Sequence, residues 1–553
     1  MDTQRIILMA AFAMVSLMLW QSWQMQINPP PAKSQEITSQ VSSQDSKDVP
    51  NVPKTQIETE TIKPTAVSDS KKLKGKRIFV KTDLLELEFD SVGADIRKVS
   101  LLDYPIDVNT NPSPVILMND SPDKFFISQT GTLNIDSSKT YSPDHNSVFV
   151  SEKTEYDMST EDSLDVSFTW TSEDQKLSVI KTYSFTKGDY AIRLNQKVIN
   201  NTGQTWQGYF YRQLQRDVGG ENSNMFIHTY TGGMLYREGG GFEKYSFDDM
   251  IDENLNKTMV GGWVAMIEHY FLAAWIPEKS GKENYYTRVV NQPGYDTRYI
   301  IGLTSKPYIV DDGSTTNIND ILFVGPKLQN KLAVISPNLD DTVDYGFLSV
   351  IAHPIFWVLD KIHGFVQNWG WSIIFLTLFI KLIFYKLSEY SYRSMAQMRK
   401  VGPKMKAIQE QHKDNAQAKN QAMMKLYKTE KINPLGGCLP IVIQIPVFIA
   451  LYWVLLESVE LRQADFMLWI NNLSAPDPFY VLPLIMGATM FIQQKLNPAP
   501  LDPIQAKVMM MLPIIFTVFF AFFPAGLVLY WVTNNVLSIA QQWYITRKIE
   551  QAP

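Results

Sequence analysis

Two patterns of hydrophobic and polar residues divide the 553-residue chain. Between residues 77 and 340, apolar and polar residues alternate in short runs, such as LSVIKTYSF at 177–185 and SVFV at 147–150, with turn-forming clusters between them. Side chains point alternately to the two faces of a strand, so this pattern predicts antiparallel strands. The number of runs is typical of a large β-sandwich.

Apolar stretches long enough to cross a membrane follow in the last third of the chain. The most distinctive is NPLGGCLPIVIQIPVFIALYWVLL at 433–456, which contains three prolines and Gln444. Such residues are tolerated in a membrane helix when neighbouring helices or water satisfy the freed backbone groups. This helix is therefore expected to pack among others. The further predicted spans are 369–385, 479–492, 507–523 and 525–543.

The N-terminal region contains one more apolar run, at residues 6–20. No cleavage site of small residues follows it, so an uncleaved anchor over 1–25 is favoured over a cleaved signal peptide. Residues 26–76 are rich in Pro, Ser, Gln, Thr, Lys and Asp and have almost no aromatic residues. This composition predicts a disordered tether.

Two segments flank the predicted span at 369–385. Residues 345–367 have apolar residues at helical spacing, interrupted by charges, which favours a helix lying along the membrane surface. A core helix of the β domain is the alternative. Residues 388–432 are basic and also have helical apolar spacing, which predicts an antiparallel helical hairpin. Its methionines suit an adaptable contact surface, or they pack the two helices together.

Charge around the apolar stretches gives the orientation. Basic segments between spans stay in the cytoplasm, and this places the hairpin and the Arg547-Lys548 tail inside. The loop at 457–478 is acidic and is expected outside. The chain is thus predicted to have six spans, one anchor and five packed together, with both termini cytoplasmic and the β domain outside.

The remaining sequence gives no sign of an enzyme. The net charge of −5 does not favour nucleic-acid binding, and the single Cys438 excludes an internal disulfide. There is no HExxH, GxSxG or paired metal-ligand spacing, so neither a metal nor a cofactor is expected. In the β domain, Asp217, Glu268 and His269 stand out, and His269 is interpreted as a surface or core histidine.

Polar residues within the predicted core spans are the strongest functional signal. Lys381 lies inside a span, where a charge either faces a polar cavity or extends to the interface. Its companions are all neutral: Thr377, Gln444, Thr489, Thr517, Thr533, Asn534 and Asn535. A positive charge among neutral groups suits attraction of a polar or acidic segment into a wet recess. A transporter or channel using this polar region, and a tethered carbohydrate-active protein, are the alternatives.

Several local motifs match one family closely. They are NPLGGCLP at 433–440, SVELR at 458–462, FMLWI at 466–470, DPFY at 477–480 and FPAGLVLYW at 523–531. The chain resembles the YidC/Oxa/Alb family of membrane protein insertases, in the Gram-negative form with a large periplasmic domain. The resemblance implies insertion and folding of inner-membrane proteins, alone or with the Sec translocon. It implies nascent membrane proteins, the Sec translocon, the ribosome and membrane lipids as partners, and no cofactor.

The resemblance also implies a fold and site residues. Five helices would enclose a hydrophilic groove, and the periplasmic domain would be a β-supersandwich. Lys381 takes the place of the family's basic groove residue, usually Arg in Gram-negative relatives; Lys keeps the charge but loses the planar fork of donors. The implied groove residues are Lys381, Gln444, Thr377, Thr517 and Asn534. The implied contact path for substrate helices comprises Ile441, Pro446, Tyr530 and Trp531. The implied capture hairpin includes Arg393, Arg399, Lys400, Met405, Met423 and Met424.

The expected layout has eight parts. They are an anchor (1–25), a tether (26–76), a periplasmic β domain (77–340), an interfacial helix (345–367), a second span (368–387), a cytoplasmic hairpin (388–432), four further spans (433–545) and a cytoplasmic tail (546–553).

Overall fold

A computed structural model gives the structure of the chain, which divides into two units, residues 1–48 and 49–553. The described residues are 48–50, 75–108, 110–135, 142–219, 229–277, 281–291, 296–412, 415–430, 439–497 and 503–550. The predicted anchor at 1–25, most of the predicted tether and the motif residues 433–438 lie outside them.

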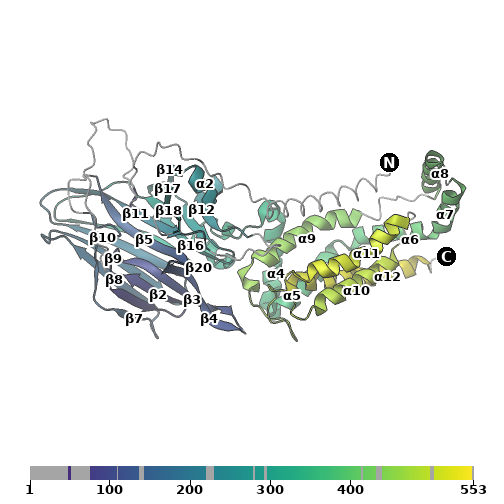
Figure 1. Ribbon diagram of the computed structural model, residues 1–553, viewed down its shortest axis with the longest axis horizontal. Coiled ribbons are helices and arrows are strands. Elements are labelled where there is room, and N and C mark those ends of the chain that lie inside the picture. Colours follow the sequence, from purple (N-terminus) through teal and green to yellow (C-terminus); the bar gives the residue numbers. More distant parts are fainter. Residues whose placement is uncertain are drawn as a thin grey trace. The chain divides into compact units, whose positions relative to one another are not determined.

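Two large sheets form the β domain (Figure 1). In the described part of the chain, the first sheet has eleven strands and the second has nine. The first sheet runs in the order β14 (Asn256–Val260), β17 (Lys282–Val290), β18 (Arg298–Thr304), β11 (Trp206–Arg216), β5 (Lys124–Asn134), β4 (Asn111–Ser121), β3 (Asp95–Asp107), β2 (Leu85–Asp90), β1 (Arg77–Lys81), β7 (Glu155–Asp157), with β19 (Tyr308–Val310) beside β11. The second runs in the order β13 (Gly241–Tyr245), β12 (Gly232–Arg237), β15 (Trp263–Ile267), β16 (Phe271–Pro277), β20 (Ser314–Pro326), β10 (Ala191–Asn200), β9 (Leu177–Thr186), β8 (Ser163–Thr171), β6 (Val150–Ser151).

The alternation seen in the sequence has a direct structural counterpart in β9. Leu177, Val179, Lys181, Tyr183 and Phe185 are buried, and the residues between them are less so. Every second side chain therefore faces the core between the sheets. The run at 147–150 behaves differently, since β6 begins only at its last residue and the run otherwise contributes one isolated bridge.

Buried charges tie the two sheets together. Arg212 of β11 is 1% exposed, and its guanidinium lies 3.1 Å from the carboxylate of Glu283 and 2.6 Å from that of Asp320. Glu283 lies on β17 of the same sheet, whereas Asp320 lies on β20 of the other sheet. Because a buried charge is costly unless paired, this arrangement fixes the sheets against each other.

Helices make up most of the chain after the last strand. Two short helices accompany the strands, α2 (Phe247–Asp252) and α3 (Gln329–Ile335). The following helical elements are η1 (Asp340–Thr342), η2 (Gly346–Leu348), α4 (Ser349–Val366), α5 (Trp369–Ile383), α6 (Tyr385–Lys400), α7 (Gly402–Gln411), α8 (Ala416–Thr429), α9 (Leu439–Glu457), η3 (Val459–Leu461), α10 (Val481–Leu496), α11 (Pro503–Phe520) and α12 (Ala525–Glu550).

Helix α4 has apolar residues on two faces. Ala352, Phe356 and Leu359 are buried in the core shared with the later helices, while Trp357 and Phe365 are exposed. The helix packs against α5 and α9, not within the β-sandwich. The interpretation as a core helix of the β domain is therefore not supported.

One bent helix pair passes a test of length and composition for a membrane span. Over the residues described, no single helix is both long and apolar enough, whereas α5 and α6 together pass the same test with a bend of 68° between them. Shorter apolar helices occur at Gln444–Glu457, Val481–Leu496 and Ala506–Phe520. The six predicted spans stay a prediction.

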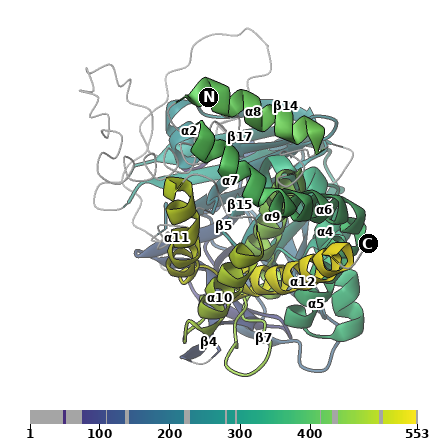
Figure 2. The same cartoon turned by 90° about the vertical axis from the view of Figure 1, so that its right-hand side faces the viewer.

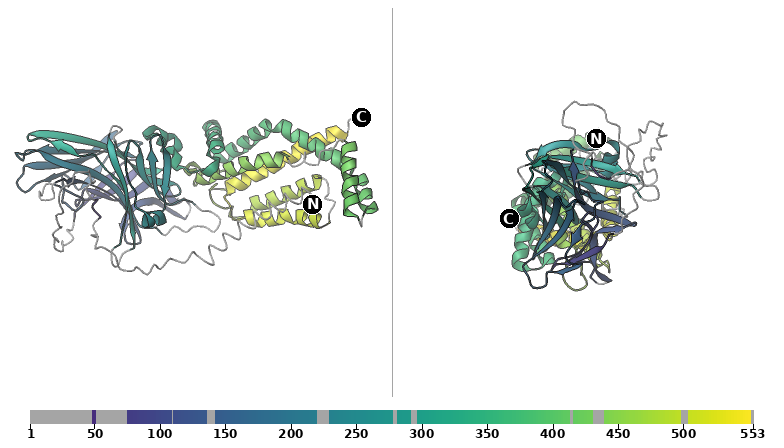
Figure 3. Two further views of the ribbon diagram at one scale, coloured as in Figure 1. Left: turned by 90° about the horizontal axis from the view of Figure 1, so that it is seen from above. Right: turned by 90° about the vertical axis from the view of Figure 1, so that its left-hand side faces the viewer.

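Close approaches between helices organise the helical core. Helix α12 lies beside α5 and α10, and α10 lies beside α11 (Figures 2 and 3). A Cβ placed on Gly487 of α10 would lie 2.0 Å from the hydroxyl oxygen of Thr517 on α11. A Cβ on Gly370 would lie 2.0 Å from the ring of Phe466. Glycine is thus required for these helices and loops to come so close.

The basic segment differs in one respect from the predicted two-helix hairpin. It contains three helices, because α6 continues from the span and ends before Gly402 and Pro403, which begin α7. Proline lacks an N–H and suits the first turn of a new helix. Helices α7 and α8 then pack together through Met405 and Met423, while Met424 is 56% exposed. The first two methionines therefore pack the helices together, and the adaptable contact surface stays a prediction.

The loop after α9 is attached to the β domain. Arg462 and Gln463 donate hydrogen bonds to the backbone carbonyls of Pro105 and Ile106 at 2.9 to 3.3 Å. Val459 belongs to the hydrophobic core of the sandwich. Loop and sandwich thus share one core.

Candidate functional site

Polar side chains of α5, α9 and α10 contact polar side chains of α12. Successive polar residues of α12 reach different partners: Asn534 contacts α9, Asn535 contacts α10 and Ser538 contacts α5. All three are buried. Buried polar groups are stable only when hydrogen-bonded, so this cluster fixes the positions of the surrounding helices. We refer to Lys381, Gln444, Thr489 and these three residues of α12 as the polar cluster.

Lys381 is held by a short chain of hydrogen bonds. Its ammonium donates to the hydroxyl of Ser538 at 2.8 Å, and that hydroxyl donates to the carbonyl of Asn534 at 2.6 Å. In the part of the chain that the structure describes, no carboxylate pairs with Lys381. The ammonium thus lies among the neutral groups of the polar cluster.

Gln444 joins the same cluster from α9. Its amide donates to the side-chain oxygen of Asn534 at 2.7 Å, and the hydroxyl of Tyr530 is also within its hydrogen-bonding reach. On the opposite side, Asn535 donates to the hydroxyl of Thr489 at 3.2 Å. The structure therefore links Lys381, Gln444 and Asn534 through α12, and their role as groove residues stays a prediction.

Two predicted groove residues lie outside these hydrogen bonds. The hydroxyl of Thr377 is buried and bonds to the carbonyl of Ile373 in its own helix at 2.7 Å. Thr517 likewise bonds to the carbonyl of Pro513 and packs against Gly487. Both hydroxyls are thus hydrogen-bonded within their own helices, and both side chains contribute to the packing between helices.

Two of the four residues of the predicted contact path for substrate helices, Tyr530 and Trp531, are aromatic. The ring of Phe448 lies 4.8 Å from that of Trp531 and 6.0 Å from that of Tyr530. Pro446 lies inside α9, next to this aromatic group. The indole N–H of Trp531 is buried and has no hydrogen-bond partner in the part of the chain that the structure describes. The side chain of Ile441 lies outside the described residues.

The capture hairpin presents its charges to solvent. Arg393 pairs with Glu389 at 2.8 Å along α6, and Lys404 pairs with Glu430 at 2.6 Å. Arg399 and Lys400 are exposed in the last turn of α6. Such exposed pairs contribute little to stability.

Two polar residues of α12 were not predicted from the sequence. Ser538 was not singled out, although it is the partner of Lys381. Gln542 continues the same face and donates to the carbonyl of Leu496 and the side chain of Asn497. Polar residues at 534, 538 and 542 recur every four residues, and this helical spacing is the signal that could have found them.

The conspicuous polar groups of the β domain have structural partners. Asp217 accepts a hydrogen bond from the backbone N–H of Phe125 at 2.7 Å, and Glu268 pairs with Arg216 at 3.3 Å. His269 donates from Nε2 to the carbonyl of Leu456 at 3.0 Å. That carbonyl is in the last turn of α9 and has no partner within the helix.

Burial decides the charge of His269. It lowers the pKa of this imidazole to about 4, and the positive charge of Lys327 acts in the same direction. His269 is therefore neutral at neutral pH and caps α9 as a hydrogen-bond donor. Across the described ranges, no group of three or more His, Cys, Asp or Glu side chains could hold a metal ion.

Large apolar side chains face outward on the helices around the polar cluster. On α5 and α11 they include Phe375, Phe379, Leu382, Met511, Ile514 and Val518. An exposed apolar surface of this kind marks contact with a membrane or with another protein.

Comparison with known proteins identifies the family. A family model described as the YidC periplasmic domain matches residues 77–358, and one described as the 60Kd inner membrane protein matches residues 361–552. A relative from Thioalkalivibrio sulfidiphilus, described as membrane protein insertase YidC, is 47% identical over 100% of this chain and 99% of its own length. The chain belongs to the YidC family. A YidC insertase of Methylococcus capsulatus is likewise 47% identical, with the same coverage of both chains.

Membership of the YidC family gives the cellular location of both parts of the structure. The helices form a membrane core in the inner membrane, and the two sheets form a periplasmic domain. Among solved structures, an active YidC insertase with its first transmembrane domain resolved matches at 17% identity and a TM-score of 0.38, covering 86% of this chain and 93% of that chain. That likeness is too low to add to the assignment.

Proposed function

We propose that this chain inserts membrane proteins into the inner membrane and helps them to fold, with the polar cluster receiving the polar leading segment of each client. The observation that carries the proposal is the ammonium of Lys381, which lies among neutral groups between apolar helices. A charge in such surroundings is costly and points to a functional role.

The proposed mechanism needs no nucleotide. Contact with the polar cluster lowers the cost of moving polar groups out of water. The apolar helix of the client then moves into lipid, driven by ~25 cal/mol per Å² of buried apolar surface. For an acidic segment moving outward, the membrane potential adds ~2.3 kcal/mol per charge per 100 mV.

The proposed arrangement has six spans, with both termini in the cytoplasm and the domain boundaries given by the sequence. Helix α4 lies along the periplasmic membrane surface, for which its exposed Trp357 and Phe365 are support. Helices α7 and α8 capture clients in the cytoplasm, with Arg393, Arg399, Lys400, Met405, Met423 and Met424 as contact residues.

Polar client segments would enter a hydrophilic groove that contains the polar cluster, and client helices would leave it along a separate contact path of Ile441, Pro446, Tyr530 and Trp531. The aromatic contacts of the last two residues with Phe448 make this path apolar. The partners would be nascent membrane proteins, the Sec translocon, the ribosome and membrane lipids. The polar cluster acts by binding, so we propose no chemical reaction and no cofactor.

A client-insertion assay tests the proposal. The full chain is placed in liposomes, a short two-span client is added without nucleotide, and protease protection of the client's outer loop is measured. We expect protection to depend on this chain. Equal insertion into empty liposomes would refute the insertase function, and leakage of small solutes would indicate a channel.

Lys381 variants test the polar cluster itself. Lys381→Ala should reduce insertion of clients with acidic tails about tenfold, the factor that ~1.4 kcal/mol gives, and should affect neutral tails less. Lys381→Arg should retain activity because it retains the charge. Lys495→Ala is the matched control, since Lys495 is an exposed lysine in the last turn of α10. Equal insertion of all clients by Lys381→Ala would contradict the role of the charge.

A further inference from the structure

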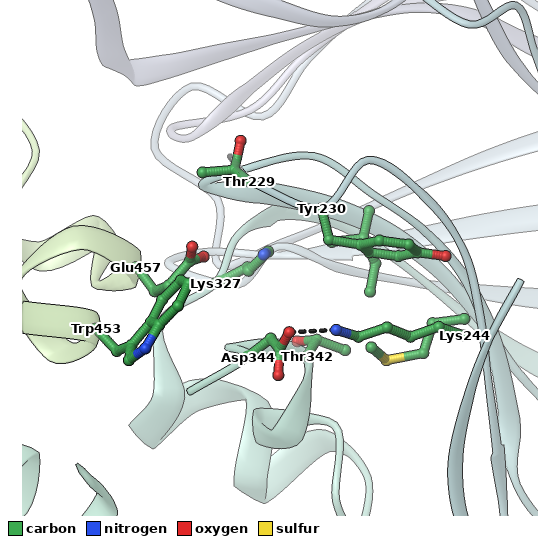
Figure 4. Close-up of a pocket in the computed structure, with 10 residues that line it drawn as sticks. Thr229, Tyr230, Lys244, Lys327, Thr342, Asp344, Trp453 and Glu457 are labelled. Carbon is green, nitrogen blue, oxygen red and sulfur yellow. Dashed lines mark hydrogen bonds and ion pairs between the residues drawn. The ribbon is translucent and has the colours of Figure 1, made fainter. Parts of the chain in front are cut away.

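The loop between α9 and α10, residues 458–480, is attached to the β domain at its start. Just before it, Glu457 of α9 lines a small cavity together with Lys327 and with Lys244 and Asp344, which form an ion pair (Figure 4). The hydrogen bonds from the loop to the end of β3 hold it there as well. Because the β domain is periplasmic, this loop lies at the periplasmic end of the helices.

Large apolar side chains of this loop are exposed. They are Met467, Leu468, Phe479 and Tyr480, and we refer to them as the loop patch. Leu468 is 81% exposed and Phe479 is 67% exposed. The neighbouring Phe466, Trp469 and Ile470 instead belong to the hydrophobic core of the helices or pack against it. Exposed apolar groups that gather in one segment mark contact with a membrane or with another protein.

A buried carboxylate connects the two parts of the loop patch. Asp477 accepts hydrogen bonds from the indole N–H of Trp469 at 2.9 Å and from the backbone N–H groups of Phe479 and Leu482 at 3.0 and 2.7 Å. Trp469 directly follows Leu468, and Leu482 lies in the first turn of α10. Asp477 thus fixes both exposed pairs to each other and to the beginning of α10.

The backbone of the loop patch is left-handed at two residues. Both Leu468 and Tyr480 have a φ of 58°. Residues other than glycine rarely adopt this conformation, because their Cβ crowds the backbone carbonyl oxygen. Glycine would fit both positions with less strain. The large apolar side chains at these positions therefore point to a contact that they make outside the chain.

The loop patch continues the apolar surface of α10. Leu484 and Ile485 in the first part of this helix are exposed, and they follow Tyr480 closely in the sequence. Helix α10 has 16 residues and is ~24 Å long at ~1.5 Å per residue. The hydrocarbon core of a bilayer is thicker, ~30 Å. Apolar side chains just before the helix reduce such a mismatch, and tyrosine is enriched at the membrane interface.

From this geometry we infer that the loop patch inserts into the periplasmic leaflet of the inner membrane. Leu468 and Phe479 contact lipid acyl chains, and Tyr480 lies at the level of the headgroups. The loop thereby sets the depth of α10 in the membrane. Continuity with α10 favours lipid over a protein partner as the occupant. This inference requires the membrane location of the family, and it is independent of Lys381 and of insertase activity.

The depth of a fluorescent label in the full chain tests the inference. In a Cys438→Ser background, NBD is attached to Leu468→Cys, to Leu484→Cys as the lipid reference, or to Ile309→Cys as the water reference. Ile309 is a matched control, since it is an exposed aliphatic residue of β19. The chain is placed in liposomes of phosphatidylethanolamine and phosphatidylglycerol. Lipids with a doxyl group on the acyl chain quench labels inside the membrane, and iodide quenches labels in water.

We expect doxyl lipids to quench the label at Leu468→Cys nearly as strongly as that at Leu484→Cys, and several-fold more than that at Ile309→Cys. Quenching by iodide alone would show that the loop stands in water and would overturn the inference. Protection from both quenchers would show that protein covers the loop, with the same consequence. If Leu468→Cys does not fold, Phe479→Cys is labelled instead.

A second measurement tests whether the loop patch acts as one unit. Leu468→Asn should reduce quenching of a label at Phe479→Cys by doxyl lipids, because Asp477 joins the two segments. Ile309→Asn should leave that quenching unchanged. Equal quenching in both variants would contradict insertion of the patch as a unit.

Discussion

Glu460 provides the sharpest test of how the loop after α9 is held. It lies in η3, and its Oε2 atom is buried without a hydrogen-bond partner among the described residues. Burial raises the pKa of this carboxyl to about 7, and the charge of Asp360 adds to the increase. Hydrogen bonds from backbone N–H groups, including that of Gln329, lower the pKa but only partly offset this increase. Replacing Glu460 with Gln removes the charge and keeps the shape.

The direction of the effect follows from proton binding. Below pH ~4.5, Glu460 is protonated whether the loop is docked or released, and there is no penalty. Between about pH 4.5 and 7 the docked state keeps a proton that the released state loses, so docking weakens as the pH rises. Above pH 7 Glu460 is ionised in the docked loop as well, and docking then carries the full free-energy cost of burying this charge. A pKa that rises from 4.5 to about 7 corresponds to about 3 kcal/mol.

Amide hydrogen exchange of residues 459–463 measures this penalty in the full chain. The amides of Leu461 and Arg462 are hydrogen-bonded within the loop, so they exchange when it opens. At pH 8, Glu460→Gln should slow their exchange about a hundredfold relative to the unmodified chain, and at pH 5 the difference should become small. Glu161→Gln is the control at an exposed site of the β domain. Equal slowing at both pH values would refute the assignment to ionisation of Glu460.

Two further predictions concern packing. Gly487→Ala should lower the thermal unfolding temperature, by the ~1–3 kcal/mol typical of overpacking, because the new Cβ meets the hydroxyl of Thr517. Adding Thr517→Ala should restore most of the loss, and additive losses would exclude this contact as the cause. Arg212→Met should destabilise the periplasmic domain by ~3–5 kcal/mol, because the carboxylates of Glu283 and Asp320 stay buried without their partner. An unchanged unfolding temperature would refute the structural role of this charge group.

Local patterns predicted the elements of the β domain well. Alternation at 177–185 corresponds to β9, because burial of one face is a property of a single strand. The pairing of Arg212 with Asp320 across two sheets was not predictable, since it depends on which strands meet in three dimensions. The same is true of Val459, a residue of the loop between α9 and α10 that packs into the core of the sandwich.

The sequence predicted most residues of the candidate site, but only part of their spatial arrangement. Charge and polarity inside apolar stretches identified Lys381, Gln444 and Asn534, which the structure joins around α12. Ser538 was overlooked because a serine in a helix is unremarkable until its partner is known. The place of Thr517 in the groove stays a prediction, and its hydroxyl bonds to the backbone of its own helix.

The central position of α12 has a consequence for the biogenesis of the chain. This helix follows α5, α9 and α10 in the sequence, so the ribosome adds it after them. Until then Lys381 and Gln444 lack the partners that Ser538 and Asn534 provide, whereas the hydroxyl of Thr489 already bonds to the carbonyl of Met486 in its own helix. Because buried polar groups are stable only when hydrogen-bonded, the helices before α12 reach their final packing only once α12 is present.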